Sequence, residues 1–73
     1  METTQVSETH ERILDVAERL FMEYGYEGTS TRMVTSEAKV NLAAVNYHFG
    51  SKEALMQAVL RRRLVILNRE RLS

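Results

Sequence analysis

Side chains that can form hydrogen bonds or carry charge are concentrated between residues 41 and 52, where the sequence places Asn41, Asn46, Tyr47, His48 and Lys52. No cysteine, histidine or carboxylate stands beside His48 at the spacing of a metal site. The sequence also marks no nucleophile with a base and a group that orients the base. Amide, hydroxyl and ammonium groups of this kind suit the phosphates and base edges of nucleic acid. We therefore expect no enzyme activity, no metal and no cofactor at this cluster, and interpret it as a binding surface.

Two short helices joined by a tight turn are predicted to carry this cluster. Ser30 is a candidate cap for a helix over Thr31–Ala38, and Asn41 for a second helix over Leu42–His48, with residues 39–41 as the turn. Apolar residues one helical turn apart are expected to face a core: Val34, Ala38, Val45 and Phe49. This is the layout of a helix-turn-helix, whose second helix lies in the major groove of DNA.

A longer helix is expected before this motif. Thr9 is its candidate cap after a disordered tail over residues 1–8, and Gly25 should end it near Tyr24 in a left-handed conformation. Tyr26 is then expected to return toward the core. The residues of this helix predicted to face inward follow the helical repeat: Ile13, Leu14, Ala17, Leu20, Phe21 and Tyr24.

The last helix is expected to begin at Lys52, after Gly50 ends the second short helix and Ser51 caps the new one. One apolar face should close a three-helix core and consists of Leu55, Ala58, Val59 and Ile66. A second apolar face, here called the apolar stripe, consists of Met56, Leu60, Leu64 and Leu67. A chain of 73 residues has little left to cover this stripe. We expect a further domain to cover the apolar stripe. The alternatives are a frayed helix end, a homodimer contact or a docking site for a protein partner.

Composition favours one small all-α domain. Proline and cysteine are absent, no stretch alternates with the period of a strand, and 73 residues lie near the lower limit for a self-sufficient core. The longest apolar run is too short to cross a membrane, and the N-terminus is unlike a secretory signal. The net charge of zero divides into −5 over residues 1–30 and +5 over residues 31–73. Two such halves could simply pair, but beside a helix-turn-helix the asymmetry favours nucleic acid as the partner.

The segment from Glu11 to Val59 resembles the DNA-binding domain of TetR-type transcription regulators. The first helix and its exit, RILDVAERLFMEYGYEGTS, match a helix that ends in a phenylalanine and a Gly-Tyr pair. The run VNYHFGSKEAL matches a recognition helix that ends in an aromatic-rich run, a phenylalanine and a Ser-Lys-Glu cap. The longer run VNLAAVNYHFGSKEALMQAV is most similar to PsrA-like, fatty-acid-responsive members.

The resemblance implies an organisation and a function. Residues 9–59 would form the helix-turn-helix domain, and residues 60–73 would continue the fourth helix toward a missing C-terminal domain that binds ligand and dimerises. The protein would be a cytoplasmic repressor that binds a palindromic operator in double-stranded DNA as a homodimer. A small-molecule effector on the missing domain would release the operator. The residues expected to contact DNA are Thr31, Asn41, Leu42, Ala43, Ala44, Asn46, Tyr47, His48 and Lys52.

These residues divide by their chemistry. The start of a recognition helix reads base edges, so Asn41 could pair with adenine or bridge to a phosphate, and the alanines would allow close approach. Asn46 could read a base from the middle of the helix. The four residues assigned to phosphates are Thr31, Tyr47, His48 and Lys52, with Thr29 and Ser30 as further candidates. For each there is also a purely structural interpretation, such as helix capping, a packed ring or a solvated side chain.

Two positions depart from the TetR-type pattern. Lys39 stands where most such domains have glycine, and Asn46 where many have tyrosine.

The run Arg61-Arg62-Arg63 resembles a nucleic-acid patch, but consecutive helical residues point in different directions. We expect these arginines to be solvated or to pair with the acidic first helix. His10 is interpreted as a surface residue.

Overall fold

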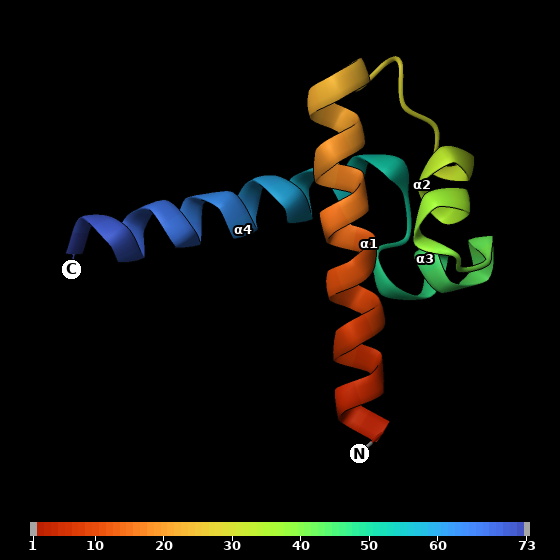
Figure 1. Cartoon of the computed structure of the whole chain (residues 1–73), viewed down its shortest axis with the longest axis horizontal. Helices are drawn as coiled ribbons and strands as arrows, with labels where there is room; N and C mark the ends of the chain where they lie inside the picture. Colours follow the sequence, from red (N-terminus) through yellow and green to blue (C-terminus); the bar gives the residue numbers. More distant parts are fainter. Residues whose placement is uncertain (1, 73) are drawn as a thin grey trace.

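The computed structural model describes the backbone of residues 2–72 and the side chains of residues 8–67. Residues 2–72 form four helices: α1 (Glu2–Tyr24), α2 (Thr31–Ala38), α3 (Leu42–His48) and α4 (Lys52–Leu72). Figure 1 shows α1 between the α2–α3 pair on one side and the projecting C-terminal half of α4 on the other. No strand occurs within residues 2–72, which confirms the all-α prediction.

The first helix begins earlier than the sequence predicted. The structure includes residues 2–8 in α1, so the predicted start of the helix after a cap at Thr9 is corrected. Neither glycine nor proline interrupts the chain before Gly25, and a helix can therefore extend through this polar segment. The predicted end is confirmed. Gly25 has a φ of 80°, and its N–H donates to the carbonyl oxygen of Phe21 at 2.8 Å.

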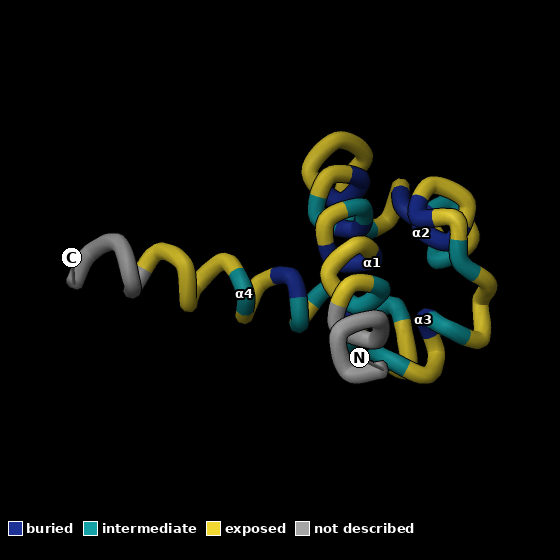
Figure 2. Tube along the Cα trace, turned by 60° about the horizontal axis from the view of Figure 1, so that its bottom comes forward, coloured by how far each residue is buried: buried dark blue, intermediate teal, exposed yellow. Residues whose placement is uncertain are grey.

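The core is a single apolar cluster to which every helix contributes. Its buried members are Ile13, Leu14, Ala17, Leu20, Phe21, Val34, Ala38, Val45, Leu55 and Val59. Tyr26, Phe49 and Ala58 are half-buried against this cluster, as their spacing predicted. In Figure 2 the buried positions lie where α1 meets α2 and the first turns of α4, while α4 is mostly exposed between residues 60 and 67. The cluster fixes the orientation of α3 through one fully buried residue, Val45.

Two residues predicted to face the core are exposed. Tyr24 is 53% exposed, because it lies at the end of α1 where no other helix covers it; the ring of Tyr26 stacks on Phe21 instead, with the ring centroids 5.8 Å apart. Ile66 is 45% exposed, because α4 crosses α1 steeply and its later turns have left the helical body (Figure 1). Helical spacing alone shows which face a residue occupies but not where the contact between two helices ends.

The predicted caps are confirmed at the start of three helices. The Ser30 hydroxyl accepts from the N–H of Met33 at 3.1 Å, and the Asn41 Oδ1 accepts from the N–H of Ala44 at 2.9 Å. The Ser51 hydroxyl accepts from the N–H of Ala54 at 3.0 Å. Each bond satisfies an amide that has no partner within its own helix. The start of each short helix is therefore determined by a local side chain.

The turn between α2 and α3 has a left-handed residue at its first position. Lys39 has φ 60° and ψ 46°, and its N–H donates to the carbonyl oxygen of Thr35. The side chain of Arg12 on α1 reaches across to this turn, where its Nε–H donates to the carbonyl oxygen of Ala38 at 2.9 Å. The C-terminal end of α2 is thus held from both sides, by its own backbone and by α1.

Replacing Lys39 by glycine should raise the free energy of unfolding by about 1 kcal/mol. Glycine adopts a positive φ without the clash of a Cβ, although its greater freedom in the unfolded chain offsets part of the gain. Urea denaturation followed by circular dichroism would measure the change. Lys39→Ala is the matched control, because alanine keeps the Cβ and should leave the stability nearly unchanged. Equal gains from both substitutions would contradict the explanation by backbone strain.

Candidate DNA-binding surface

Helix α3 has one buried face and one exposed face. Val45 is completely buried, whereas Tyr47 is 80% exposed and Leu42 is 48% exposed. Ala44 is half-buried beside Val45. We call the exposed face the outer face of α3; it consists of Asn41, Leu42, Ala43, Asn46 and Tyr47. The structure therefore brings five of the nine predicted DNA contacts onto one accessible surface.

The cap at Asn41 limits what this side chain can offer to a partner. Its Oδ1 already accepts from the N–H of Ala44 at 2.9 Å. A two-bond contact with adenine uses both the oxygen and the nitrogen of an amide, so it would require the cap to open. The amide nitrogen of Asn41 remains suited to a phosphate while the cap stays in place. Of the two roles predicted for Asn41, the geometry favours the phosphate.

Thr29, Ser30 and Thr31, around the start of α2, have different environments. Thr29 is buried, and its hydroxyl donates to the carbonyl oxygen of Leu20 at 3.0 Å, so this candidate phosphate contact is corrected to a structural residue. Ser30 caps α2. Thr31, at the first position of α2, is half-buried.

His48 ends α3 within a cluster of aromatic rings. Its ring centroid lies 5.5 Å from that of His10, and His10 stacks on Phe49 at 4.7 Å. His10 lies at the surface, as the sequence predicted, with its side chain 39% exposed, and its ring also covers the half-buried Phe49. Burial, and secondarily the neighbouring His10, lower the pKa of His48. At neutral pH the His48 ring is consequently neutral and can donate one hydrogen bond.

Lys52 is held at the start of α4 by an aromatic ring. Its Nζ lies 4.2 Å from the centroid of Tyr26, which is close enough for a cation–π contact. The sequence prediction gave both residues but did not pair them, because Tyr26 lies in the loop after α1 and Lys52 begins α4, far apart in the chain. The contact limits the directions that the ammonium group can take.

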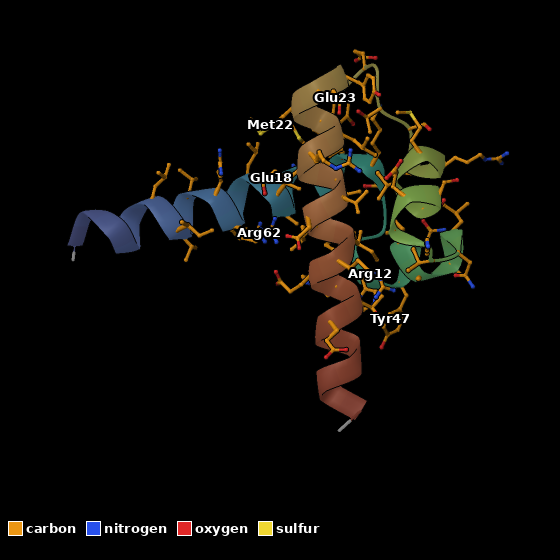
Figure 3. The ribbon with its side chains drawn as sticks, viewed as in Figure 1. Arg12, Glu18, Met22, Glu23, Tyr47 and Arg62 are labelled. Atoms are coloured by element: carbon orange, nitrogen blue, oxygen red, sulfur yellow. The ribbon has the colours of Figure 1, made fainter. Side chains whose placement is uncertain are left out.

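Arg12 is a residue of this region that the sequence interpretation missed. Its side chain is exposed on α1 and reaches the end of α2 through Ala38. Figure 3 shows Arg12 between α1 and α3, above Tyr47. Arg12 is one of two arginines in the mainly acidic first helix, and this was the available signal. Its contact partner, a backbone carbonyl in another helix, could not be identified from spacing.

Opposite charges occupy different parts of the molecule. The guanidinium of Arg62 on α4 contacts the carboxylates of Glu11 and Asp15 at 2.9 Å and of Glu18 at 2.7 Å, and Arg63 also contacts Glu18, at 3.1 Å. Figure 3 shows Arg62 and Glu18 at the crossing of α1 and α4. These contacts confirm the predicted pairing with the acidic first helix for Arg62 and Arg63, whereas Arg61 is exposed.

The segment from α2 to the start of α4 has an excess of positive charge. Residues 31–52 contain three basic side chains, Arg32, Lys39 and Lys52, and one acidic side chain, Glu37. Glu37 is paired with Arg19 of α1 at 2.8 Å. The part of the molecule that carries the outer face of α3 therefore favours the binding of a polyanion.

Two short helices, a tight turn and an exposed second helix supported by α1 and α4 define a helix-turn-helix DNA-binding domain. Residues 13–59 match the family described as "Bacterial regulatory proteins, tetR family", and the chain belongs to this family. It is the DNA-binding domain of a transcriptional regulator and not an enzyme. Among the residues that the structure describes, no helix is long and apolar enough to cross a membrane.

Three curated relatives illustrate the similarity. The A-factor receptor protein of Streptomyces griseus is 40% identical over 53 residues, which cover 73% of this chain and 19% of the relative. The regulator UidR of Escherichia coli K12 is 33% identical over 57 residues, covering 78% of this chain and 29% of the relative. The repressor AcnR of Corynebacterium efficiens is 38% identical over 53 residues, covering 73% and 28%. The chain thus matches less than a third of the length of each of these relatives.

Proposed function

We propose that this domain reads one half-site of a palindromic operator, as half of a two-fold dimer, and acts in a repressor. The observation that carries this proposal is the outer face of α3, which is exposed to solvent while the buried Val45 anchors the opposite face of the helix. Helices held in this way can enter the major groove with their N-terminal residues toward the bases. The excess of positive charge over residues 31–52 supports the same orientation.

The proposed contacts fall into two groups. The residues assigned to the floor of the groove are Leu42, Ala43, Ala44 and Asn46, where apolar or amide side chains lie close to base edges. The residues assigned to phosphates are Thr31, Asn41, Tyr47, His48 and Lys52. Phosphate contacts fix the position of a protein on DNA, and base contacts select the sequence. This division makes the two groups separable by experiment.

The rest of the functional cycle is also a proposal. Residues 9–59 would form the DNA-binding unit, and the segment 60–73 would lead from α4 toward a C-terminal domain that dimerises and binds a small-molecule effector. The effector would release the operator, and the protein would act in the cytoplasm. The fatty-acid-responsive, PsrA-like subgroup remains a prediction from the sequence run around α3.

The apolar stripe supports a second candidate function, docking of a protein partner. Leu60, Leu64 and Leu67 are exposed, whereas Met56 is half-buried against the core and is removed from the stripe. If protein docking were the main role, Leu64→Ser would abolish function and Lys52→Ala would not. Binding to duplex DNA and binding to a protein partner are therefore tested by different variants.

Lys52→Ala should weaken binding to all duplex sequences about equally. Loss of one phosphate contact should reduce the magnitude of the log–log salt slope by about 0.9. Fluorescence anisotropy with a selected and a random duplex, at several salt concentrations, measures both effects. Lys52→Arg keeps the charge and should keep the slope. Tyr47→Phe should weaken both duplexes with an unchanged slope, because it removes a hydroxyl and no charge. An unchanged slope for Lys52→Ala would remove Lys52 from the interface.

Ala44→Leu should damage operator binding while α1 to α4 remain folded. A larger side chain at a close-approach position would push α3 out of the groove, and the affinity should fall by about tenfold or more, since base contacts contribute about 1–3 kcal/mol each. Ala44→Ser is the matched control of similar size and should bind nearly as well. Circular dichroism checks the fold. Unfolding of Ala44→Leu would instead assign Ala44 to the core.

A further inference from the structure

Lys39 is the only non-glycine residue with a positive φ within residues 2–72. Its φ of 60° and ψ of 46° place it in the left-handed region, where the Cβ of an L residue is disfavoured. Glycine and asparagine adopt this conformation more readily. Backbone strain of this kind is concentrated at functional sites. The identity of the side chain at this position therefore needs an explanation.

The fold makes no visible use of the lysine side chain. The hydrogen bond that Lys39 makes within the turn comes from its backbone N–H to Thr35, and glycine or asparagine would supply the same bond. The side chain is exposed, and it takes part in no ion pair or hydrogen bond with residues 8–67. Its charge is thus available for a partner outside the domain.

Four other cations among residues 8–67 are engaged within the domain. Arg19, Arg62 and Arg63 contact carboxylates, and Arg12 donates to a backbone carbonyl. Lys39 differs from these because it lies in the segment of positive charge excess, whose one carboxylate is already paired with Arg19. An anion approaching the turn would meet this ammonium without competition from a neighbouring carboxylate.

The turn leads directly into the outer face of α3. Lys39 lies two residues before Asn41 and three before Leu42. The contact from Arg12 to Ala38 holds the turn in place immediately before Lys39. A lysine carries a rotatable ammonium on a flexible four-carbon stem, so the charge can reach the phosphates at the edge of a groove that α3 occupies.

We propose that Lys39 contacts a phosphate of the DNA backbone beside the groove, and that this contact accounts for a lysine in a left-handed turn. The inference rests on the proposed function, because it requires the outer face of α3 to lie in the groove. The ligand is the duplex backbone, so the contact adds affinity for every sequence. Lysine at position 39 therefore lowers the stability of the free domain and raises its affinity for duplex DNA.

The test compares the unchanged chain with Lys39→Asn and Lys39→Arg. Asparagine tolerates the left-handed conformation and removes the charge, whereas arginine keeps both the charge and the strain. Each protein is titrated with a random-sequence duplex of about three helical turns at several salt concentrations. Urea denaturation of the same proteins gives their unfolding midpoints.

Lys39→Asn should bind the random duplex about eightfold more weakly near 0.1 M salt, with a salt slope smaller in magnitude by about 0.9. Its unfolding midpoint should rise at the same time. Lys39→Arg should keep the slope, the affinity and the midpoint of the unchanged chain. Opposite changes in stability and affinity are the specific signature, because a general loss of folding would lower both.

An unchanged salt slope for Lys39→Asn would overturn this inference, as would an equal loss of affinity in Lys39→Arg. In both cases the proposed function would stand, provided that the unchanged chain binds duplex DNA with a strong salt dependence. Failure of the unchanged chain to bind either the random or a selected duplex would overturn the proposed function, and this inference with it.

Discussion

Two copies of the domain joined in a two-fold arrangement should bind a palindromic duplex about 10²–10⁴ times more tightly than one copy. The reason is effective concentration: once the first copy is bound, the second is held beside its half-site. A suitable fusion places a two-fold dimeric helical domain after Leu72 and spaces the two α3 helices by about 34 Å. Operator titrations of the free and fused chains measure the gain.

A duplex with a single half-site is the matched control for this experiment. The fused chain should lose nearly all of its advantage on that duplex, because the second copy has nothing specific to bind. Leu60, Leu64 and Leu67 are exposed and could pair free chains at high concentration, so sedimentation of the free chain is needed alongside. Equal affinity of free and fused chains, with the free chain monomeric, would contradict the half-site proposal.

Replacing Arg62 by glutamine should lower the free energy of unfolding by about 2–3 kcal/mol. The Arg62 side chain is only 21% exposed and contacts three carboxylates of α1. Burial disfavours its charge, but these hydrogen bonds outweigh that effect and hold the pKa of Arg62 above its ordinary value. Glutamine cannot neutralise the carboxylates, which would then repel one another at the crossing of α1 and α4. Urea denaturation measures the loss.

Arg63→Gln is the control for this prediction. Arg63 is 55% exposed and has a single contact, to Glu18 at 3.1 Å. Exposed ion pairs contribute about 0–1 kcal/mol, so the loss should be small. If the two substitutions destabilise the domain equally, the Arg62 contacts have no special part in holding α4 against α1.

The sequence by itself determined the features that depend on near neighbours in the chain. Ser30, Asn41 and Ser51 cap their helices because each side chain bonds an amide three residues later. Gly25 ends α1 because glycine readily adopts the positive φ that this position requires. The family resemblance was likewise carried by a contiguous segment, which the match over residues 13–59 confirms.

Only the tertiary structure decided which residues from different helices meet. The steep crossing of α1 and α4 brings Arg62 to three carboxylates and leaves Ile66 outside the core. The packing of α1 against the end of α3 places His10 on Phe49, and the exit from α1 buries Thr29 beneath its last turn. Helical periodicity specifies the direction of a side chain around its own axis. The angle and extent of each helix–helix contact depend on both surfaces at once, and these determine which side chains are covered.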